Sequence, residues 1–290
     1  MSAPGTMTIA GAGVRVRCAA ATDIGRARSV NEDSVLLSAP IFMVADGMGG
    51  HEAGEVASSI AVEEFSRLTD ARTLRIEDLG AALRSAQARI EALGSGGPHA
   101  AGTTVALVAT MAIDGISYWV VLNLGDSRVY RVSEDLFEQV SVDHSVVQEL
   151  VDKGELTLAE ARTHPYRHMI TRALGAGPAS DPDYWLIPAE TGDRVLICSD
   201  GLSGEVPDAT IERTLRDAPC PQAACDALVE LALAAGGHDN VSVVVIEAVE
   251  VLGTGPAETT APGPGADRTP TPLEEDTLPR PVPVDRRGAS

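Results

Sequence analysis

The chain has 290 residues, 44% of them hydrophobic, and a formal net charge of -20. This length and apolar fraction suffice for one large domain or two smaller ones with a sizeable core. The negative charge argues against nonspecific nucleic-acid binding and against a polybasic contact with a membrane, and it makes cations the expected companions.

Two further features bear on the compartment. No apolar run approaches the roughly 20 residues that a membrane helix requires, and the N-terminus lacks the basic-then-apolar pattern of a signal peptide. The four cysteines are scattered along the chain, so reduced thiols are expected rather than a disulfide framework. These cysteines are Cys18, Cys198, Cys220 and Cys225. We therefore expect a cytoplasmic protein.

The first part of the chain predicts three strands followed by two helices. We expect residues 1–13 to be flexible and the fold to begin at Val14, where apolar and polar residues alternate. An apolar strand that starts at Ile41 stops at Asp46 and turns through glycines toward His51. The i, i+3, i+4 spacing that follows predicts helices that cover one face of a sheet. The predicted elements are strands 14–19, 34–37 and 41–45 and helices 53–68 and 77–93.

The second part is first rich in strands, joined by loops too short for crossover helices, which predicts an antiparallel meander. The segment 144–174 reads as an excursion from the sheet with short helices. Another apolar strand then ends on Asp200, and Asp239 precedes the final strand. The predicted elements are strands 103–111, 116–124, 127–132, 137–140, 194–199 and 241–246 and helices 146–151, 158–162, 208–215 and 222–235.

Residues 251–290 form a proline-rich stretch with few apolar side chains, a composition that cannot support a core. We expect a disordered tail that is either a plain extension or a docking segment for a partner. The globular domain is accordingly expected to span residues 14–250.

Several acids recur in one setting. Asp46, Asp200 and Asp239 each lie at a strand boundary close to glycine, and Glu32 and Asp33 precede another strand. A single Asp-Gly pair is common in turns, but three aspartates at strand ends close to glycine favour a site. Carboxylates that converge without a positive partner are driven toward protonation unless a cation joins them. Oxygen ligands select Mg2+ or Mn2+, and the chain lacks histidine and cysteine at zinc-ligand spacing.

Five ordered motifs together resemble the metal-dependent PP2C (PPM) protein phosphatases, and their bacterial branch most closely. Order and spacing agree across about residues 14–248. The motifs are Asp46-Gly47-Met48-Gly49-Gly50-His51, the R-x-x-N-E-D run from Arg28 to Asp33, Gly125-Asp126-Ser127-Arg128, Ser199-Asp200-Gly201-Leu202 and Asp239-Asn240. The resemblance implies an α+β fold, a four-layer α-β-β-α sandwich of two mainly antiparallel sheets flanked by helices. It also implies hydrolysis of phosphoserine and phosphothreonine on proteins, opposing bacterial Ser/Thr kinases.

The resemblance assigns roles to the acids. Asp46 would bridge two Mn2+ or Mg2+ ions, and the carbonyl of Gly47 would bind one of them. Asp200 and Asp239 would bind the other ion. The second-shell acids, which would orient metal-bound waters, are Glu32 and Asp33. A metal-activated bridging water would then be the nucleophile.

Three other residues have competing interpretations. Arg28 occupies the family's phosphate-binding position, whereas Arg26 falls outside the pattern and reads as a surface charge. Asp126 either holds a third, weaker metal together with Asp200 or is a turn aspartate. Cys198 lies among apolar neighbours and reads as a core residue rather than a catalyst.

The histidines are less clearly assigned. His51 either protonates the leaving oxygen or is a surface residue at a helix start. The eukaryotic branch carries a histidine where this chain has Met48, so its general-acid role cannot be transferred. The segment 144–174 resembles the family's flap. Its histidines are expected to pack or to lie on the surface: His144, His164 and His168.

Two other functions stay open from the sequence. The chain could be a pseudophosphatase that binds phosphoproteins without turnover, or a hydrolase of small phosphoesters, because metals read only the phosphoryl group. Expected partners are phosphorylated proteins, with Ser/Thr kinases as a further candidate. We expect a monomer with no nucleic-acid partner and no membrane span.

Overall fold

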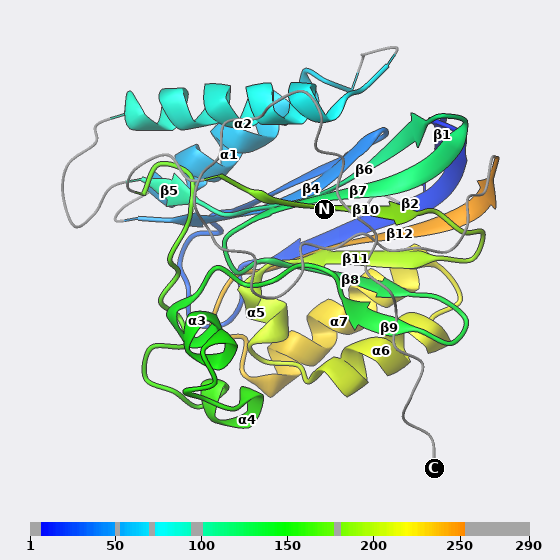
Figure 1. Cartoon of the computed structure of the whole chain (residues 1–290). Helices are drawn as coiled ribbons and strands as arrows, with labels where there is room; N and C mark the ends of the chain where they lie inside the picture. The colour runs from blue at the N-terminus through cyan, green and yellow to red at the C-terminus, as the bar shows by residue number, and fades with distance from the viewer. Residues whose placement is uncertain (1–6, 50–52, 70–72, 94–100, 177–180, 253–290) are drawn as a thin grey trace.

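The structure is a computed structural model that describes residues 7–49, 53–69, 73–93, 101–176 and 181–252. Two β-sheets lie face to face, and helices cover the outer face of each sheet (Figure 1). Every strand pairing in these ranges is antiparallel. The expected α+β architecture, a four-layer α-β-β-α sandwich, is therefore confirmed.

The first sheet joins the beginning and the end of the described chain. Its central strand β12 pairs with β2 on one side and with β11 on the other. In order across the sheet, the strands are β1 (Met7–Gly11), β2 (Val14–Asp23), β12 (Val241–Val251), β11 (Arg194–Cys198), β8 (Arg128–Val132) and β9 (Phe137–Gln139). Its outer face is covered by α6 (Asp208–Asp217) and α7 (Pro221–Ala235).

The second sheet is built mainly from the middle of the chain. In order across it, the strands are β10 (Asp183–Pro188), β7 (Ile116–Leu124), β6 (Val105–Ile113), β4 (Ile41–Met48) and β3 (Asp33–Ser38), with β5 (Gly102–Thr103) paired to the end of β4. Its outer face is covered by α1 (Ala53–Ser66) and α2 (Ile76–Glu91). As the sequence predicted, two successive helices cover one sheet face.

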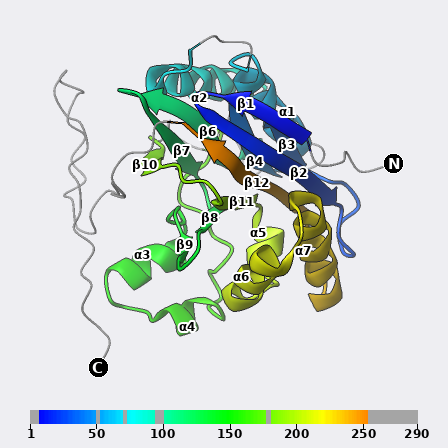
Figure 2. The same cartoon turned by 90° about the vertical axis from the view of Figure 1, so that its right-hand side faces the viewer.

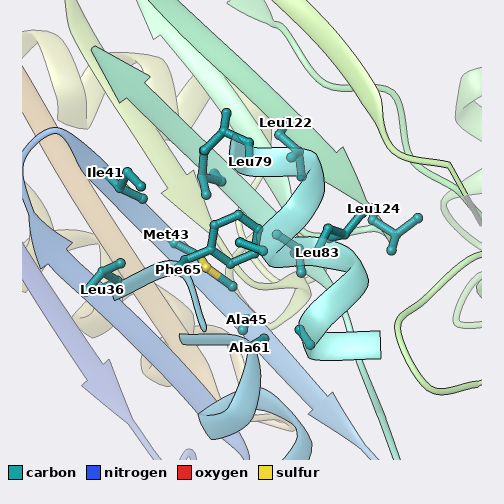
Figure 3. Close-up of a cluster of buried hydrophobic side chains, with 14 of the residues drawn as sticks. Leu36, Ile41, Met43, Ala45, Ala61, Phe65, Leu79, Leu83, Leu122 and Leu124 are labelled. Atoms are coloured by element: carbon teal, nitrogen blue, oxygen red, sulfur yellow. The ribbon is translucent and has the colours of Figure 1, made fainter. Parts of the chain in front are cut away.

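Strand β4 shows why its sheet must be covered on both faces. Phe42 and Val44 lie in the core between the two sheets, whereas Ile41 and Met43 lie in the core beneath α1 and α2. Alternate side chains of a strand point to opposite faces, so a strand that is apolar at every position must be buried on both. Figure 3 shows the helix-side cluster, in which Phe65 of α1 lies among residues of both helices and the sheet.

Three short elements lie outside the sandwich or at its end. The helices α3 (Val146–Asp152) and α4 (Leu158–Ala161) belong to the flap and stand away from both sheets (Figure 2). The helix α5 (Asp200–Ser203) directly follows strand β11, so Asp200 begins a helical turn rather than an open loop. In the part of the chain that the structure describes, no helix is long and apolar enough to cross a bilayer.

The structure departs from the predicted elements in two strands. Strand β10 follows the flap in a stretch where no element was predicted, although Asp183–Pro188 contains the β-favouring residues Tyr184, Trp185 and Ile187. Strand β1 places Met7–Gly11 in the first sheet, so the expectations that residues 1–13 are flexible and that the fold begins at Val14 are wrong for this segment. Its pairing with β2 uses backbone groups, which side-chain patterns do not reveal. The tail 253–290 lies outside the described residues.

The cluster beneath α1 and α2 provides a test of the architecture. Phe65 is fully buried, and replacing it with alanine should destabilise the protein by about 3–5 kcal/mol, because the change removes apolar contacts and leaves a cavity. Leu158 of α4 is 68% exposed, so Leu158→Ala should cost less than about 0.5 kcal/mol. Urea unfolding followed by circular dichroism measures both. Equal losses would contradict the assignment of this core.

Candidate functional site

Both sheets deliver acids to one end of the sandwich. In the second sheet, Asp33 at the start of β3 lies directly opposite Asp46 near the end of β4. In the first sheet, Asp200 follows β11 and Asp239 precedes its neighbour β12. Since antiparallel neighbours end and begin at the same sheet edge, these four acids meet there.

The electrostatics of Asp46 confirm that the acids are close. Burial raises the pKa of the Asp46 carboxyl well above its ordinary range, and negative charges nearby raise it further. Those charges belong to Asp33, Asp200, Asp126 and Asp239. Four further acids thus act on one buried carboxyl, an arrangement that favours either protonation or a bound cation.

Glycines allow the acid-bearing segments to touch through their backbones. A Cβ atom on Gly47 would lie 2.5 Å from the carbonyl oxygen of Glu32, and one on Gly201 would collide with the carbonyl oxygen of Asn240. The Gly47 amide also donates a hydrogen bond of 3.2 Å to that Glu32 carbonyl. Only glycine permits such approach, so the Asp-Gly pairs at residues 46 and 200 are packing requirements as well as turns.

Asn240 fastens the acidic turn that precedes β3. Its Oδ1 accepts a hydrogen bond of 2.9 Å from the Glu32 amide, and its Nδ2 donates to the carbonyl oxygens of Ile24 and Val30 at 2.9 and 3.0 Å. The sequence placed Asn240 in a motif but gave it no role. The signal available in the sequence was an asparagine directly after Asp239, at the start of a strand. Its hydrogen-bond partners lie about two hundred residues away in the chain.

Asp33 has one satisfied oxygen and one that lacks a partner. The Ser199 hydroxyl donates to Asp33 Oδ2 at 2.9 Å, while Oδ1 is buried without a hydrogen-bond partner among the described residues. Burial raises the pKa of Asp33 to about 7, although the hydroxyls of Ser242 and Ser199 favour its charged form. A buried acceptor without a donor is costly in protein alone, and water or a cation would satisfy it.

Two threonines hold the backbone of Asp46. The Asp46 amide donates to Thr104 Oγ1 at 3.0 Å, and the Thr103 hydroxyl donates to the Asp46 carbonyl at 3.0 Å. Thr104 Oγ1 also lies 2.7 Å from Ser127 Oγ in the next turn. Asp46 and the Asp126 turn are therefore joined by hydroxyl groups. Nothing in the local sequence distinguishes Thr103 and Thr104 from other strand threonines.

Arg28 lies beside the acids and Arg26 does not. Arg28 Nη2 is 2.7 Å from Asp239 Oδ2. Partial burial lowers the pKa of the Arg28 guanidinium, but the charge and hydrogen bond of Asp239, together with the charges of Glu32 and Asp46, outweigh it and raise the pKa. Arg26 is exposed and reaches this region through its backbone amide, which donates to the Gly237 carbonyl.

The expectation that the carboxylates lack a basic partner is wrong for Asp239, because Arg28 pairs with it across a long separation in sequence. The His168 ring of the flap is farther away, with Nδ1 3.9 Å from Asp200 Oδ2. No ion pair joins Asp46 or Asp33 to a described side chain, although the charges of Arg28 and Asp46 act on each other over a longer distance.

The donor set fits a hard divalent cation. In the ranges that the structure describes, no three histidine, cysteine or acidic side chains form a ready metal cage, so cation binding requires these carboxylates to draw together. The chemistry of the set nevertheless matches: carboxylate oxygens predominate, and Asp33 Oδ1 is an orphaned buried acceptor. A cation would also relieve the mutual repulsion that raises the pKa of Asp46.

The remaining predicted residues lie as follows. The Glu32 carboxylate accepts a hydrogen bond from the Gly54 amide at the start of α1. Burial and the charges of Asp200 and Asp143 raise the pKa of Asp126 well above its ordinary range, so Asp126 lies within electrostatic reach of Asp200. His51 lies outside the described residues.

Cys198 is unsuited to nucleophilic catalysis. Its side chain is fully buried in strand β11, and burial raises the pKa of the thiol to about 12. The reactive thiolate is therefore disfavoured near neutral pH. The structure agrees with the sequence interpretation of Cys198 as a core residue.

The sequence matches the family model described as Protein phosphatase 2C over residues 26–219. It is 40% identical over 239 residues to the Serine/threonine protein phosphatase PstP of Mycobacterium tuberculosis, which covers 81% of this chain and 45% of that protein. It is 36% identical over 237 residues to the Serine/threonine phosphatase stp of Listeria innocua, covering 78% of this chain and 93% of that protein. The chain thus spans less than half of the mycobacterial relative and most of the other.

Solved structures agree with these relatives. The crystal structure of Mycobacterium tuberculosis PstP/Ppp matches with a TM-score of 0.74 and 39% identity, covering 80% of this chain and 98% of that one. The catalytic domain of PstP in complex with 2 manganese ions matches with a TM-score of 0.73 and 38% identity, covering 81% and 99%.

The repulsion among the acids predicts opposite effects of one substitution with and without metal. Asp46→Asn should stabilise the metal-free protein by at least about 1 kcal/mol, because it removes a buried charge that the fold disfavours. Because the pKa of Asp46 is higher in the folded than in the unfolded state, the metal-free wild-type protein loses stability as the pH rises from about 4 to the folded-state pKa. The stability difference between Asp46→Asn and wild type should therefore grow between these two pH values. Thermal unfolding in EDTA measures it.

The same variant should lose most of the stabilisation that Mn2+ gives the wild-type protein, which at a hundredfold excess over Kd is about 2.7 kcal/mol. Glu230→Gln is a matched control, because it makes the same change from acid to amide at an exposed position of α7. Destabilisation of metal-free protein by Asp46→Asn, with full Mn2+ stabilisation retained, would refute the metal assignment.

Proposed function

Because this chain belongs to the protein phosphatase 2C family, we propose that it removes phosphate from phosphoserine and phosphothreonine in proteins with Mn2+ or Mg2+ as cofactor. The observation that carries the proposal is the convergence of Asp33, Asp46, Asp200 and Asp239 beside Arg28. The printed names of the relatives support the substrate class, and the manganese complex of PstP supports two metal ions. The enzyme would oppose bacterial Ser/Thr kinases.

We assign the metal positions by the family pattern. Asp46 would bridge the two ions, the Gly47 carbonyl would bind one, and Asp200 and Asp239 would bind the other. Asp126, which lies within electrostatic reach of Asp200, would hold a third and weaker ion. When bound, such ions lower the pKa of a water molecule for attack on phosphorus and offset charge on the phosphoryl oxygens.

The protein's own groups would position the reactants. Arg28 can exchange its bond to Asp239 for two phosphoryl oxygens, since a guanidinium presents parallel donors that match a phosphate. Asp33 Oδ1 offers an unused acceptor to a water in the site, while the Ser199 hydroxyl fixes the other oxygen of the same carboxylate. The Glu32 carboxylate is held by the Gly54 amide at the start of α1 and would orient metal-bound water. These contacts would orient the attacking water and the phosphoryl group relative to each other.

The leaving oxygen of serine or threonine needs a proton. His51 is the sequence candidate for its donor, and this role stays a prediction because His51 lies outside the described residues. The intact set of Asp46, Asp200 and Asp239 argues against a pseudophosphatase. Small phosphoesters share the phosphoryl group with phosphoproteins, so the substrate test includes them.

Activity should require metal and the Asp200 carboxylate. The protein should release phosphate from a phosphothreonine peptide with Mn2+ and not in EDTA. Asp200→Asn should lower turnover on the order of 100-fold or more, because it weakens a metal ligand, whereas Glu230→Gln should stay at the wild-type rate. A malachite-green assay measures released phosphate. Lack of Mn2+-dependent release from phosphopeptide by wild-type protein would contradict the proposal, and preference for small phosphoesters would redirect it.

Arg28 and Arg26 provide a matched pair for the phosphate contact. Arg28→Lys keeps the charge but loses the bidentate fork, so kcat/KM for a phosphopeptide should fall about 10-fold or more. Arg26→Lys should leave kcat/KM unchanged, because the Arg26 side chain forms no ion pair with the described acids, whereas Arg28 pairs with Asp239. Mn2+ stabilisation should persist in both variants. A larger loss from Arg26→Lys than from Arg28→Lys would reverse the assignment.

A further inference from the structure

His144 was expected to be a packing or surface histidine, yet its contacts are with the turn that carries Asp126 and with the base of the flap. It is 3% exposed. Its backbone amide donates to the Gly125 carbonyl at 2.9 Å, and the Gly125 amide donates to its ring Nδ1 at 3.1 Å. One residue therefore holds both polar groups of Gly125.

The Gly125 turn is tightly constrained. Gly125 adopts a φ of +116°, and a Cβ atom there would lie 2.6 Å from Thr104 Cβ. Asn123 Nδ2 supplies a further hydrogen bond to the Gly125 carbonyl at 3.1 Å. Because Thr104 also accepts from the Asp46 amide, the position of this turn bears on Asp46 and Asp126 together.

The hydrogen bonds define the tautomer of His144. A backbone amide can only donate, so Nδ1 must be the unprotonated acceptor and Nε2 must carry the proton. Nε2 lies 3.1 Å from Asp183 Oδ2 at the start of β10, which accepts that proton's hydrogen bond. Arg172 Nη1 of the flap lies 3.4 Å from Asp183 Oδ1 and 3.3 Å from His144 Nε2. The Asp183 carboxylate is therefore bound by Arg172 as well as by His144.

The flap begins and ends at His144. Its carbonyl accepts a hydrogen bond of 2.7 Å from the Thr171 amide, and Ser145 forms an antiparallel bridge with Ile170. The segments that enter and leave the flap are thus joined at His144, the residue that forms hydrogen bonds with both polar groups of Gly125. Displacement of the flap base would be transmitted to the Asp126 turn through the His144 ring and backbone.

We propose that His144 is a positioning residue that fixes the Gly125–Asp126 turn to the flap base, with its ring Nδ1 accepting the Gly125 amide and its Nε2 donating to Asp183. It touches no proposed metal or substrate atom and acts through Asp126. Its consequence for metal use rests on the proposed function, whereas its hold on the turn does not.

Two substitutions separate the halves of the ring. The Oδ1 of asparagine stands as many bonds from the backbone as Nδ1, so His144→Asn retains an acceptor for the Gly125 amide. The Nε2 of glutamine matches the ring Nε2, so His144→Gln retains a donor to Asp183 and leaves that amide unpaired. The fold should persist in both, because the Arg128 and Asp143 side chains join the same segments through hydrogen bonds of 2.6 to 3.0 Å.

Amide hydrogen exchange of a peptide spanning residues 124–128 tests the hold on the turn. His144→Gln should speed exchange about tenfold through loss of one buried hydrogen bond, and His144→Asn should remain within about threefold of wild type. His144→Gln should also raise the Mn2+ concentration for half-maximal turnover about 10-fold, a readout that general destabilisation would not move selectively. Equal behaviour of the two variants, or unchanged exchange in His144→Gln, would overturn the proposal.

A measurement on the wild-type chain needs no variant. The 15N shifts of the His144 ring should show a protonated Nε2 and an unprotonated Nδ1; the opposite tautomer or an imidazolium would overturn the proposal. If the wild-type chain releases no phosphate, the proposed function fails, while the exchange and 15N results still decide the role of His144. If these fail and phosphate release persists, only the role of His144 is lost.

Discussion

Mutual repulsion among buried carboxylates is the constraint on which the acid-bearing end of the sandwich depends. Asp46 is surrounded by the charges of Asp33, Asp200, Asp126 and Asp239, and burial adds to their effect on its pKa. A folded chain holds such groups together only when other interactions fix their backbones. The Asn240 side chain, Thr103 and Thr104 bind backbone groups of Glu32 and Asp46, and the Ser199 hydroxyl binds the carboxylate of Asp33. The site is thus assembled at a cost that a cation can offset.

The sandwich supplies the rigidity that this arrangement needs. Acids from both sheets meet at one end, while three apolar clusters fill the spaces between sheets and beneath the two helix pairs. Close approach of Gly47 to Glu32 locks the acid-bearing segments of the second sheet, and close approach of Gly201 to Asn240 locks those of the first. The hydrogen bonds from the Glu32 amide to Asn240 and from the Ser199 hydroxyl to Asp33 join the segments of the two sheets. The flap stands outside these layers and is joined to the end of the sandwich at its base (Figure 2). His144 joins the two.

Local patterns in the sequence predicted most strands and helices and the aspartates that border the apolar strands. The two-sheet sandwich was predicted from the resemblance to the PP2C family. The sequence could not predict what supports the aspartates. Asn240 reaches Ile24, and Ser199 reaches Asp33, through contacts between segments that only the finished fold brings together. Strand β10 was missed after the flap. The sequence predicted only a packing or surface role for His144, because its partners Gly125 and Asp183 lie in segments that the fold brings to it.

The central claim is that the acids at the end of the sandwich hold divalent cations, and anomalous diffraction from a crystal soaked in Mn2+ tests it most directly. Two manganese peaks should flank Asp46, with Asp200 and Asp239 drawn toward one of them and the bond from Arg28 to Asp239 released. Absence of peaks at Asp46, with that bond intact at saturating Mn2+, would contradict the claim.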